Sequence, residues 1–196
     1  MKQAELILGA LVLGAIAMSL LLLPLAGVIL VLCLSSLSMM YMALSFALLN
    51  GIRLRKMFDS DSYKSISTPR IIGAVLTGFA LSITAVGIMF KLLSWPGASA
   101  NLSVGIAGLF IALVVGLVRF LNKRSPFYIN LFKRIAVFGG LGLLLLLSPE
   151  YAWLKMKYRE HPEYVEAIRQ ANADPTNALL QQRLKDEREK LENRNR

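Results

Sequence analysis

The sequence is poor in the residues that most often carry chemistry. It contains one cysteine, Cys33, and one histidine, His161, among 196 residues. A disulfide framework, a multi-cysteine metal site and a histidine cluster are therefore excluded within the chain. Cys33 stands inside an apolar run, where we expect a small buried thiol. The sequence offers no catalytic, metal-binding or cofactor-binding set, and we expect a protein that is not an enzyme.

Charged residues are also scarce. They make up 17% of the chain, whereas hydrophobic residues make up 56%, and this composition is too apolar for an ordinary soluble domain. Before Ile135 there are 12 basic and 3 acidic residues, whereas the remainder has 10 basic and 9 acidic residues. The excess positive charge lies in loops between apolar runs, where it orients a protein in a bilayer. No basic stripe interleaved with aromatic residues is present, so the sequence argues against nucleic-acid binding.

Long apolar runs are what the sequence has instead. A bilayer core about 30 Å thick requires about 20 helical residues. Five segments are expected to span it, at about 5–23, 27–49, 71–90, 102–121 and 135–154. The first two are divided at Leu23-Pro24-Leu25-Ala26-Gly27, because proline and glycine weaken a helix interior. The fold class is therefore all-α, with a polytopic transmembrane helical domain over residues 1–154 and a short, soluble helical tail over residues 155–196.

Several helix ends are marked by local signals. We expect a left-handed stop at Asn50-Gly51, a cap at Asn101 for the fourth span, and helix starts at Ser67-Thr68-Pro69, His161-Pro162-Glu163 and Asp174-Pro175, the last opening a helix to about Glu192. The fifth apolar run, 135–147, reaches spanning length only if it continues past Pro149 to Leu154, with Tyr151 and Trp153 as an aromatic belt.

The distribution of basic residues predicts the orientation. Loops 50–70 and 122–134 carry five and four basic residues, whereas loop 91–101 carries only Lys91. The positive-inside rule places both basic loops and the N-terminus in the cytoplasm, in the cytoplasmic (inner) membrane. Five spans then place the tail outside. If the fifth run is interfacial or re-entrant, the tail is cytoplasmic instead, which would suit its basic residues Lys155, Lys157 and Arg159.

Ionisable groups deep in a membrane usually mark a functional path, and the sequence predicts none at mid-span. Glu5, Lys91, Arg119 and Glu150 stand near span ends and are expected at the interface. Milder polar residues occur within the second span, at Ser35, Ser36, Ser38 and Ser45. Such serines can join neighbouring helices or line a path for a solute, and both roles remain open.

Small residues recur every four positions on the third and fourth spans. They are Ala74, Gly78 and Ser82 on the third, and Gly108, Ala112 and Gly116 on the fourth. This spacing lets helix backbones approach closely. It predicts a tight antiparallel hairpin, or a face for other subunits.

The two spans are joined by a tight turn, Ser94-Trp95-Pro96-Gly97-Ala98, in which Trp95 suits the interface and Pro96-Gly97 reverses the chain. The run Phe-Lys-Leu-Leu-Ser-Trp-Pro-Gly-Ala at 90–98, set between membrane helices over 71–121, resembles the hairpin of the L-type inner-membrane subunit of the gliding-motility and type IX secretion motor. Similar turns occur in small membrane proteins of the same bacterial group. The resemblance implies a related hairpin. Subunits of that family form a ring around a partner's helix and use proton flow, handled by a carboxylate in the second hairpin helix. The matching helix here has no Asp or Glu between Leu102 and Leu121.

Together these features predict a non-enzymatic scaffold or accessory subunit of a membrane complex. We expect it to assemble, with further copies or with another membrane protein, through small-residue helix faces in the lipid bilayer. The alternative is a small transporter or channel along the serine face of the second span.

Overall fold

The computed structural model describes residues 2–23, 25–52, 56, 66–122, 124–149 and 151–194. This part of the chain is helical and contains no strand. Its helices are α1 (Lys2–Leu20), α2 (Ala26–Asn50), α3 (Thr68–Leu93), α4 (Ala98–Asn122), α5 (Pro126–Arg134), the π-helical turn η3 (Ile135–Gly139), α6 (Gly140–Leu147), α7 (Ala152–Lys157), α8 (Pro162–Ala173) and α9 (Ala178–Arg194). Five of its helical segments are long and apolar enough to cross a membrane, with α5, η3 and α6 forming one of them. The chain is therefore an all-α, multi-pass membrane protein, and the predicted fold class is confirmed.

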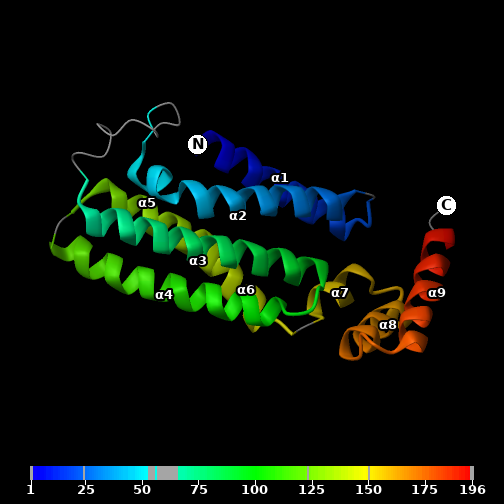
Figure 1. Cartoon of the computed structure of the whole chain (residues 1–196). Helices are drawn as coiled ribbons and strands as arrows, with labels where there is room; N and C mark the ends of the chain where they lie inside the picture. The colour runs from blue at the N-terminus through cyan, green and yellow to red at the C-terminus, as the bar shows by residue number, and fades with distance from the viewer. Residues whose placement is uncertain are drawn as a thin grey trace.

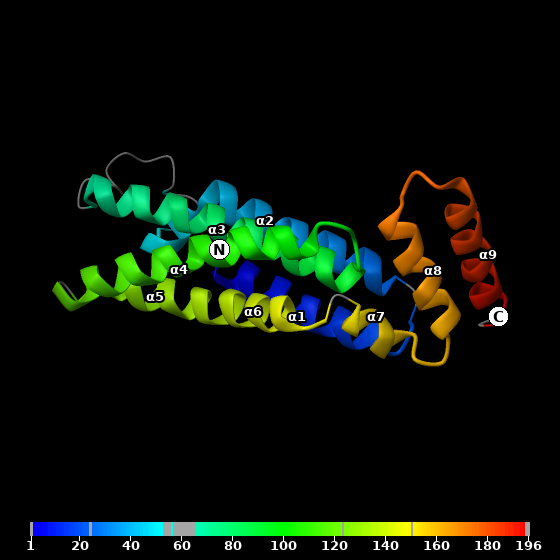
Figure 2. The same ribbon diagram turned by 90° about the horizontal axis from the view of Figure 1, so that it is seen from below.

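The spans form a bundle around α3. In Figure 1, α1 to α4 follow one another across the bundle, and the fifth span lies behind them. Figure 2 shows α5 and α6 beneath α2, α3 and α4, with α1 on the same lower side. Of the spanning stretch of α3, 56% of residues are buried, against 17% for α1 and for α4. The helix with neighbours on most sides is thus α3, whereas α1 and α4 present broad apolar faces to the membrane.

The helix ends follow local signals at several predicted positions. Gly51 closes α2 with φ 74°, the left-handed conformation that glycine adopts without strain. Helix α3 starts at Thr68 with Pro69 in its first turn, and α8 starts at Pro162. These three predictions are confirmed. The chain also breaks between Leu20 and Ala26, as expected, although Pro24 itself lies outside the described residues.

The fifth span differs most from its expected bounds. It covers Pro126–Leu147, whereas the apolar pattern predicts 135–154. The helix starts early because the Ser125 hydroxyl accepts the N–H of Phe127 and Pro126 occupies its first turn. It ends before Pro149, which cannot continue it, and α7 forms a separate short helix. Lys133 and Arg134, expected in a loop, thus belong to a membrane helix.

Two expected helix starts are also wrong. Helix α9 begins at Ala178, because the Asn177 side chain accepts the N–H of Leu179, whereas Asp174 binds Thr176 in a turn before it. Asn101 lies inside α4, which already begins at Ala98 directly after the turn. Helix α9 therefore starts four residues after Asp174, and α4 starts three residues before Asn101.

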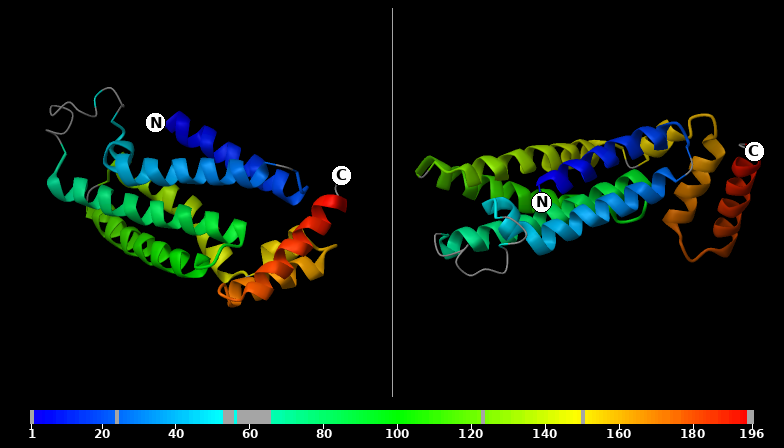
Figure 3. Two further views of the ribbon diagram at one scale, coloured as in Figure 1. Left: turned by 45° about the vertical axis from the view of Figure 1, so that its right-hand side comes forward. Right: turned by 90° about the horizontal axis from the view of Figure 1, so that it is seen from above.

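The Trp-Pro-Gly turn lies against the C-terminal tail. Ser94 and Gly97 reverse the chain with φ values of 57° and 82°, and the Trp95 ring meets the edge of Phe90 at 5.3 Å. The side-chain amide of Asn172, on α8, donates to the Ser94 carbonyl at 3.2 Å. Figure 3 shows α8 and α9 at this end of the bundle, away from the N-terminus. The fold thus places the tail and this turn at one end, and the starts of α3 and α5 at the other.

The small residues of α3 and α4 pack inside the molecule. A Cβ added at Gly78 would overlap Ser45 and approach the Tyr41 carbonyl, both on α2. On α4, a Cβ at Gly108 would come within 2.9 Å of the Ala80 Cβ of α3. One at Gly116 would come within 3.2 Å of Leu131 on α5. The α3 stripe therefore faces α2, and the α4 stripe divides between α3 and α5.

This packing predicts that Gly78→Leu destabilises the protein. Forcing a side chain into the α2–α3 contact costs about 1–3 kcal/mol or more. Gly140→Leu is the matched control, because a Cβ there meets nothing within 4 Å. The thermal unfolding midpoint of the purified protein in detergent should fall for Gly78→Leu only. Equal midpoints for the two variants would contradict the packing.

Candidate functional site

Three polar side chains meet between α1, α2 and α5. The Arg134 guanidinium donates through Nε to Glu5 Oε1 at 2.7 Å and through Nη2 to Glu5 Oε2 at 2.5 Å. The Tyr41 hydroxyl donates to the same Oε1 at 2.5 Å. Both carboxylate oxygens are thus engaged, and the forked ion pair has the two-bond geometry that makes arginine–carboxylate contacts strong and directional.

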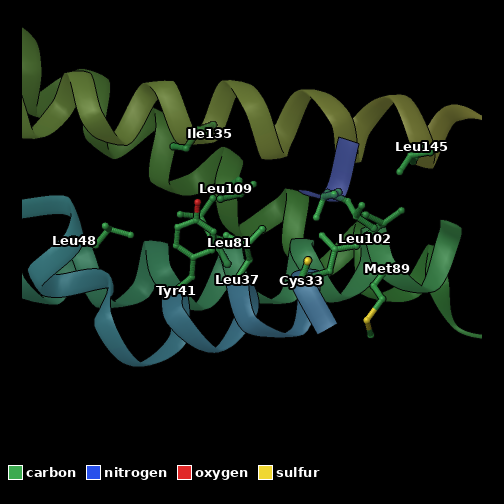
Figure 4. Packing of buried hydrophobic residues seen from close by; sticks show 14 of the residues in the cluster. Cys33, Leu37, Tyr41, Leu48, Leu81, Met89, Leu102, Leu109, Ile135 and Leu145 are labelled. Atoms are coloured by element: carbon green, nitrogen blue, oxygen red, sulfur yellow. The ribbon is translucent and has the colours of Figure 1, made fainter. Parts of the chain in front are cut away.

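The cluster is set among apolar side chains. Tyr41 is fully buried, and Arg134 is 8% exposed. Figure 4 shows Tyr41 beside Leu37, Leu81 and Leu109. The Tyr41 ring also meets the Phe138 ring edge-on, with centroids 5.1 Å apart. Water has little access here, so neither charge can be left without its partner at low cost.

The position of these residues along their helices places the cluster inside the bundle. Arg134 comes eight residues after Pro126, which puts it about 12 Å along the fifth span at 1.5 Å per residue. Tyr41 comes nine residues before Asn50, about 13 Å from that end of α2. In Figure 1 the start of α1 is set back from the same ends of α2 and α3. Glu5 and Arg134 therefore meet at a level that lies inside the bundle, away from the ends of α2 and α3.

Local structure supports each member of the cluster. Glu5 stands in the first turn of α1, where the helix dipole favours a negative charge. The Arg134 Nη1 also donates to the Asn130 carbonyl at 3.1 Å, within its own helix. The π-helical turn η3 follows directly and contains Phe138. Such turns are frequent at functional sites because they re-aim the side chains on either side.

Sequence patterns did not reveal this site. They predicted Glu5 at the interface and Arg134 in a loop, with no ionisable group deep in a span. Arg134 instead lies inside the fifth span, where it binds Glu5 of the first turn of α1. The apolar pattern begins only after Arg134, which hides the start of the helix. The capping signal at Ser125-Pro126 could have found it, because a helix that starts there carries Arg134 inward.

Other predicted polar positions have identifiable contacts. Lys91 stands in the last turn of α3, near the span end as expected, and is buried. Its Nζ donates to the Ser148 carbonyl at the end of the fifth span, 3.3 Å away. Cys33 is a buried free thiol, as expected. Arg119 is exposed near the end of α4, and Glu150 lies outside the described residues. Among the described residues, Lys91, Cys33 and Arg119 do not join the Glu5 cluster.

Three of the four serines predicted on α2 contact α3. The Ser38 hydroxyl lies 2.7 Å from that of Ser82 on α3. Ser45 is buried against Gly78, also on α3. Ser35 donates to the sulfur of Met89, whereas Ser36 is exposed. Most of these hydroxyls therefore lie at the α2–α3 contact.

The remaining packing residues lie apart from the ion pair. Ala74 is completely buried and Ser82 nearly so, both on the α3 stripe, whereas Ala112 on α4 is partly buried against the core. Trp95, Pro96 and Gly97 stay together in the turn at the opposite end of the bundle. The spacing in the sequence groups the small residues by helix. In the fold they belong to three different helix contacts: α2–α3, α3–α4 and α4–α5.

The fold and the cluster define a multi-pass α-helical membrane protein with a largely buried carboxylate–guanidinium pair between its first and fifth spans. No family model, no curated protein and no solved structure matches this chain.

The pair predicts strong coupling between two substitutions. Glu5→Gln or Arg134→Gln alone should lower the free energy of unfolding by about 3–5 kcal/mol, because each leaves a buried charge without its partner. The double variant should lose less than the sum of the two single losses. Unfolding of each variant in detergent micelles measures the coupling. Tyr41→Phe is a milder comparison, with an expected loss of about 1–3 kcal/mol. Additive losses for the double variant would contradict a direct ion pair.

Proposed function

We propose that this chain is a non-enzymatic scaffold or accessory subunit of the cytoplasmic membrane, and that it assembles through α1. The observation that carries the proposal is an open face of small residues on that helix. Ala10, Gly14 and Ala17 are all exposed, and a Cβ added at Gly14 would meet nothing within 4 Å. Small residues at such spacing allow two membrane helices to approach closely.

The internal packing directs the proposal to this helix. The small residues of α3 and α4 are in contact with helices of the same chain, so assembly through them would require the bundle to open. Helix α1 lies at the side of the bundle, with 17% of its spanning residues buried, and Glu5 ties it to the fifth span. An exposed helix that is already fixed in position suits a subunit contact, because it loses little conformational entropy on binding.

The serine contacts support packing over transport. A transporter or channel along α2 would need polar groups that face a common path. Ser38 bonds to Ser82 and Ser45 packs against Gly78, so these side chains join α2 to α3. Packing is therefore the proposed role of these serines, and solute flux into liposomes that depends on Ser38 would contradict it.

The proposed orientation has the N-terminus and the loops before α3 and α5 in the cytoplasm. Segments 50–70 and 122–134, which include these loops, carry nine of the 12 basic residues outside the tail. With five spans, the Trp95 turn and the tail would lie on the opposite side of the membrane, at the end where Asn172 meets Ser94.

Assembly predicts that Gly14→Leu weakens a complex without unfolding the protein. The control is Gly140→Leu, which places the same side chain at another exposed helical glycine with open space around it. Native mass spectrometry of protein extracted from membranes should show wild type and the control in a complex, and Gly14→Leu mainly as a monomer. A monomeric wild-type protein would refute assembly. An intact Gly14→Leu complex would refute the assignment to α1.

The orientation predicts the outcome of reporter fusions. Alkaline phosphatase joined after Arg196 should be active, because it is exported, whereas the same enzyme joined after Gly51 should be inactive. Green fluorescent protein at the two positions should give the reverse pattern. Inactive phosphatase at Arg196 would place the tail in the cytoplasm and contradict the orientation.

A further inference from the structure

A groove of about 690 Å³ lies between α3, α4 and the start of α5, apart from the Glu5 cluster. Gly108 and Ala112 form part of its lining, and Leu76, Ile111 and Val115 stand along it. The last three are 65%, 63% and 53% exposed, so the groove opens on the apolar outer face of the bundle. In a membrane this face contacts lipid chains.

One end of the groove is basic. Arg70 and Arg119 both line it there, together with Asn122 and Ser125. The Arg70 guanidinium stacks on the Phe127 ring, with its carbon 4.5 Å from the ring centre. Its Nε is buried and has no hydrogen-bond partner among the described residues. A cation held in place by an aromatic ring in the wall of the groove attracts an anion that enters it.

Two helix starts add to this positive field. Ser67, before α3, and Ser125, before α5, both line the groove at its basic end. The Phe127 N–H is already bonded to the Ser125 hydroxyl, but the helix dipole of both helices is positive at this end. Anions bind at such positions.

The length of the groove fits half of a bilayer. Arg119 lies 11 residues beyond Gly108 on α4, a distance of about 16 Å along the helix. One leaflet contributes about 15 Å to a hydrocarbon core about 30 Å thick. An acyl chain can therefore lie along the apolar lining while the phosphate of the same molecule reaches the arginines.

We propose that this groove binds an anionic phospholipid, with its phosphate between Arg70 and Arg119 and one acyl chain between α3 and α4. A lipid satisfies both ends of the groove at once, whereas a soluble anion would leave the apolar part empty. Basic pockets between membrane helices are known to recognise acidic headgroups by this combination of charge and apolar contact. The proposal does not depend on assembly through α1.

The test compares two lipids with the same acyl chains on the full-length protein in detergent. Native mass spectrometry should show phosphatidylglycerol bound at least tenfold more tightly than phosphatidylcholine. Arg119→Gln should weaken phosphatidylglycerol binding about tenfold, since it removes a charge-assisted contact at an exposed position. Arg70→Gln should do the same. Arg124→Gln is the matched control: Arg124 is an exposed cation at the same end that does not line the groove, and binding should change less than twofold.

A second variant tests the apolar part with every charge in place. Val115→Trp should fill the groove and weaken binding of both lipids, and thermal midpoints near the wild-type value would show that the variants remain folded. Equal binding of the two lipids by the wild type would overturn the proposal. So would a loss in Arg124→Gln as large as that in Arg119→Gln, because the effect would then come from the general charge of this end.

Discussion

The ion pair between Glu5 and Arg134 is the interaction on which the arrangement of this bundle depends. It joins residues 129 positions apart and closes the first span onto the fifth, with the Tyr41 hydroxyl of α2 on the same carboxylate. Because two charges in an apolar interior are tolerated only when both are paired, the pair fixes the depth of α1 relative to the fifth span. A shift of either helix by one residue would separate the forked contact. The ion pair thus fixes the register of α1 against the fifth span, which apolar contacts alone do not specify.

The rest of the bundle uses close approach of backbones. Helix α3 lies at the centre, with Gly78 against α2 and Ala80 against Gly108 of α4, and hydroxyl bonds such as Ser38–Ser82 strengthen the same contacts. Lipid chains are as apolar as leucine, so membrane helices associate through such packing and polar contacts. The result is a bundle with different surfaces. We propose a protein neighbour for the open face of small residues on α1, and a lipid for the groove with Arg70 at its basic end.

The number and approximate place of the spans could be predicted from the sequence, because twenty apolar residues in a row have few other structures open to them. Signals that act within one turn, such as Gly51 and Pro162, were equally readable. The candidate site was not. Its members lie at positions 5, 41 and 134, and no periodicity links residues that far apart. Arg134 was hidden further by its neighbours, since a basic residue at the edge of an apolar run resembles a loop until the Ser125 cap is taken into account. Which helix each small residue contacts depends on how its own helix is rotated about its axis. The sequence spacing of the small residues does not give that rotation.

The most direct test of this account is solid-state NMR of the protein in lipid bilayers. Dipolar recoupling between arginine guanidinium nitrogens and glutamate carboxyl carbons detects a direct ion pair. The account predicts a strong contact that disappears in both Glu5→Gln and Arg134→Gln, and that persists when Arg124 is replaced by glutamine. Absence of that contact, with the Glu5 carboxylate exchanging magnetisation with water instead, would contradict the account.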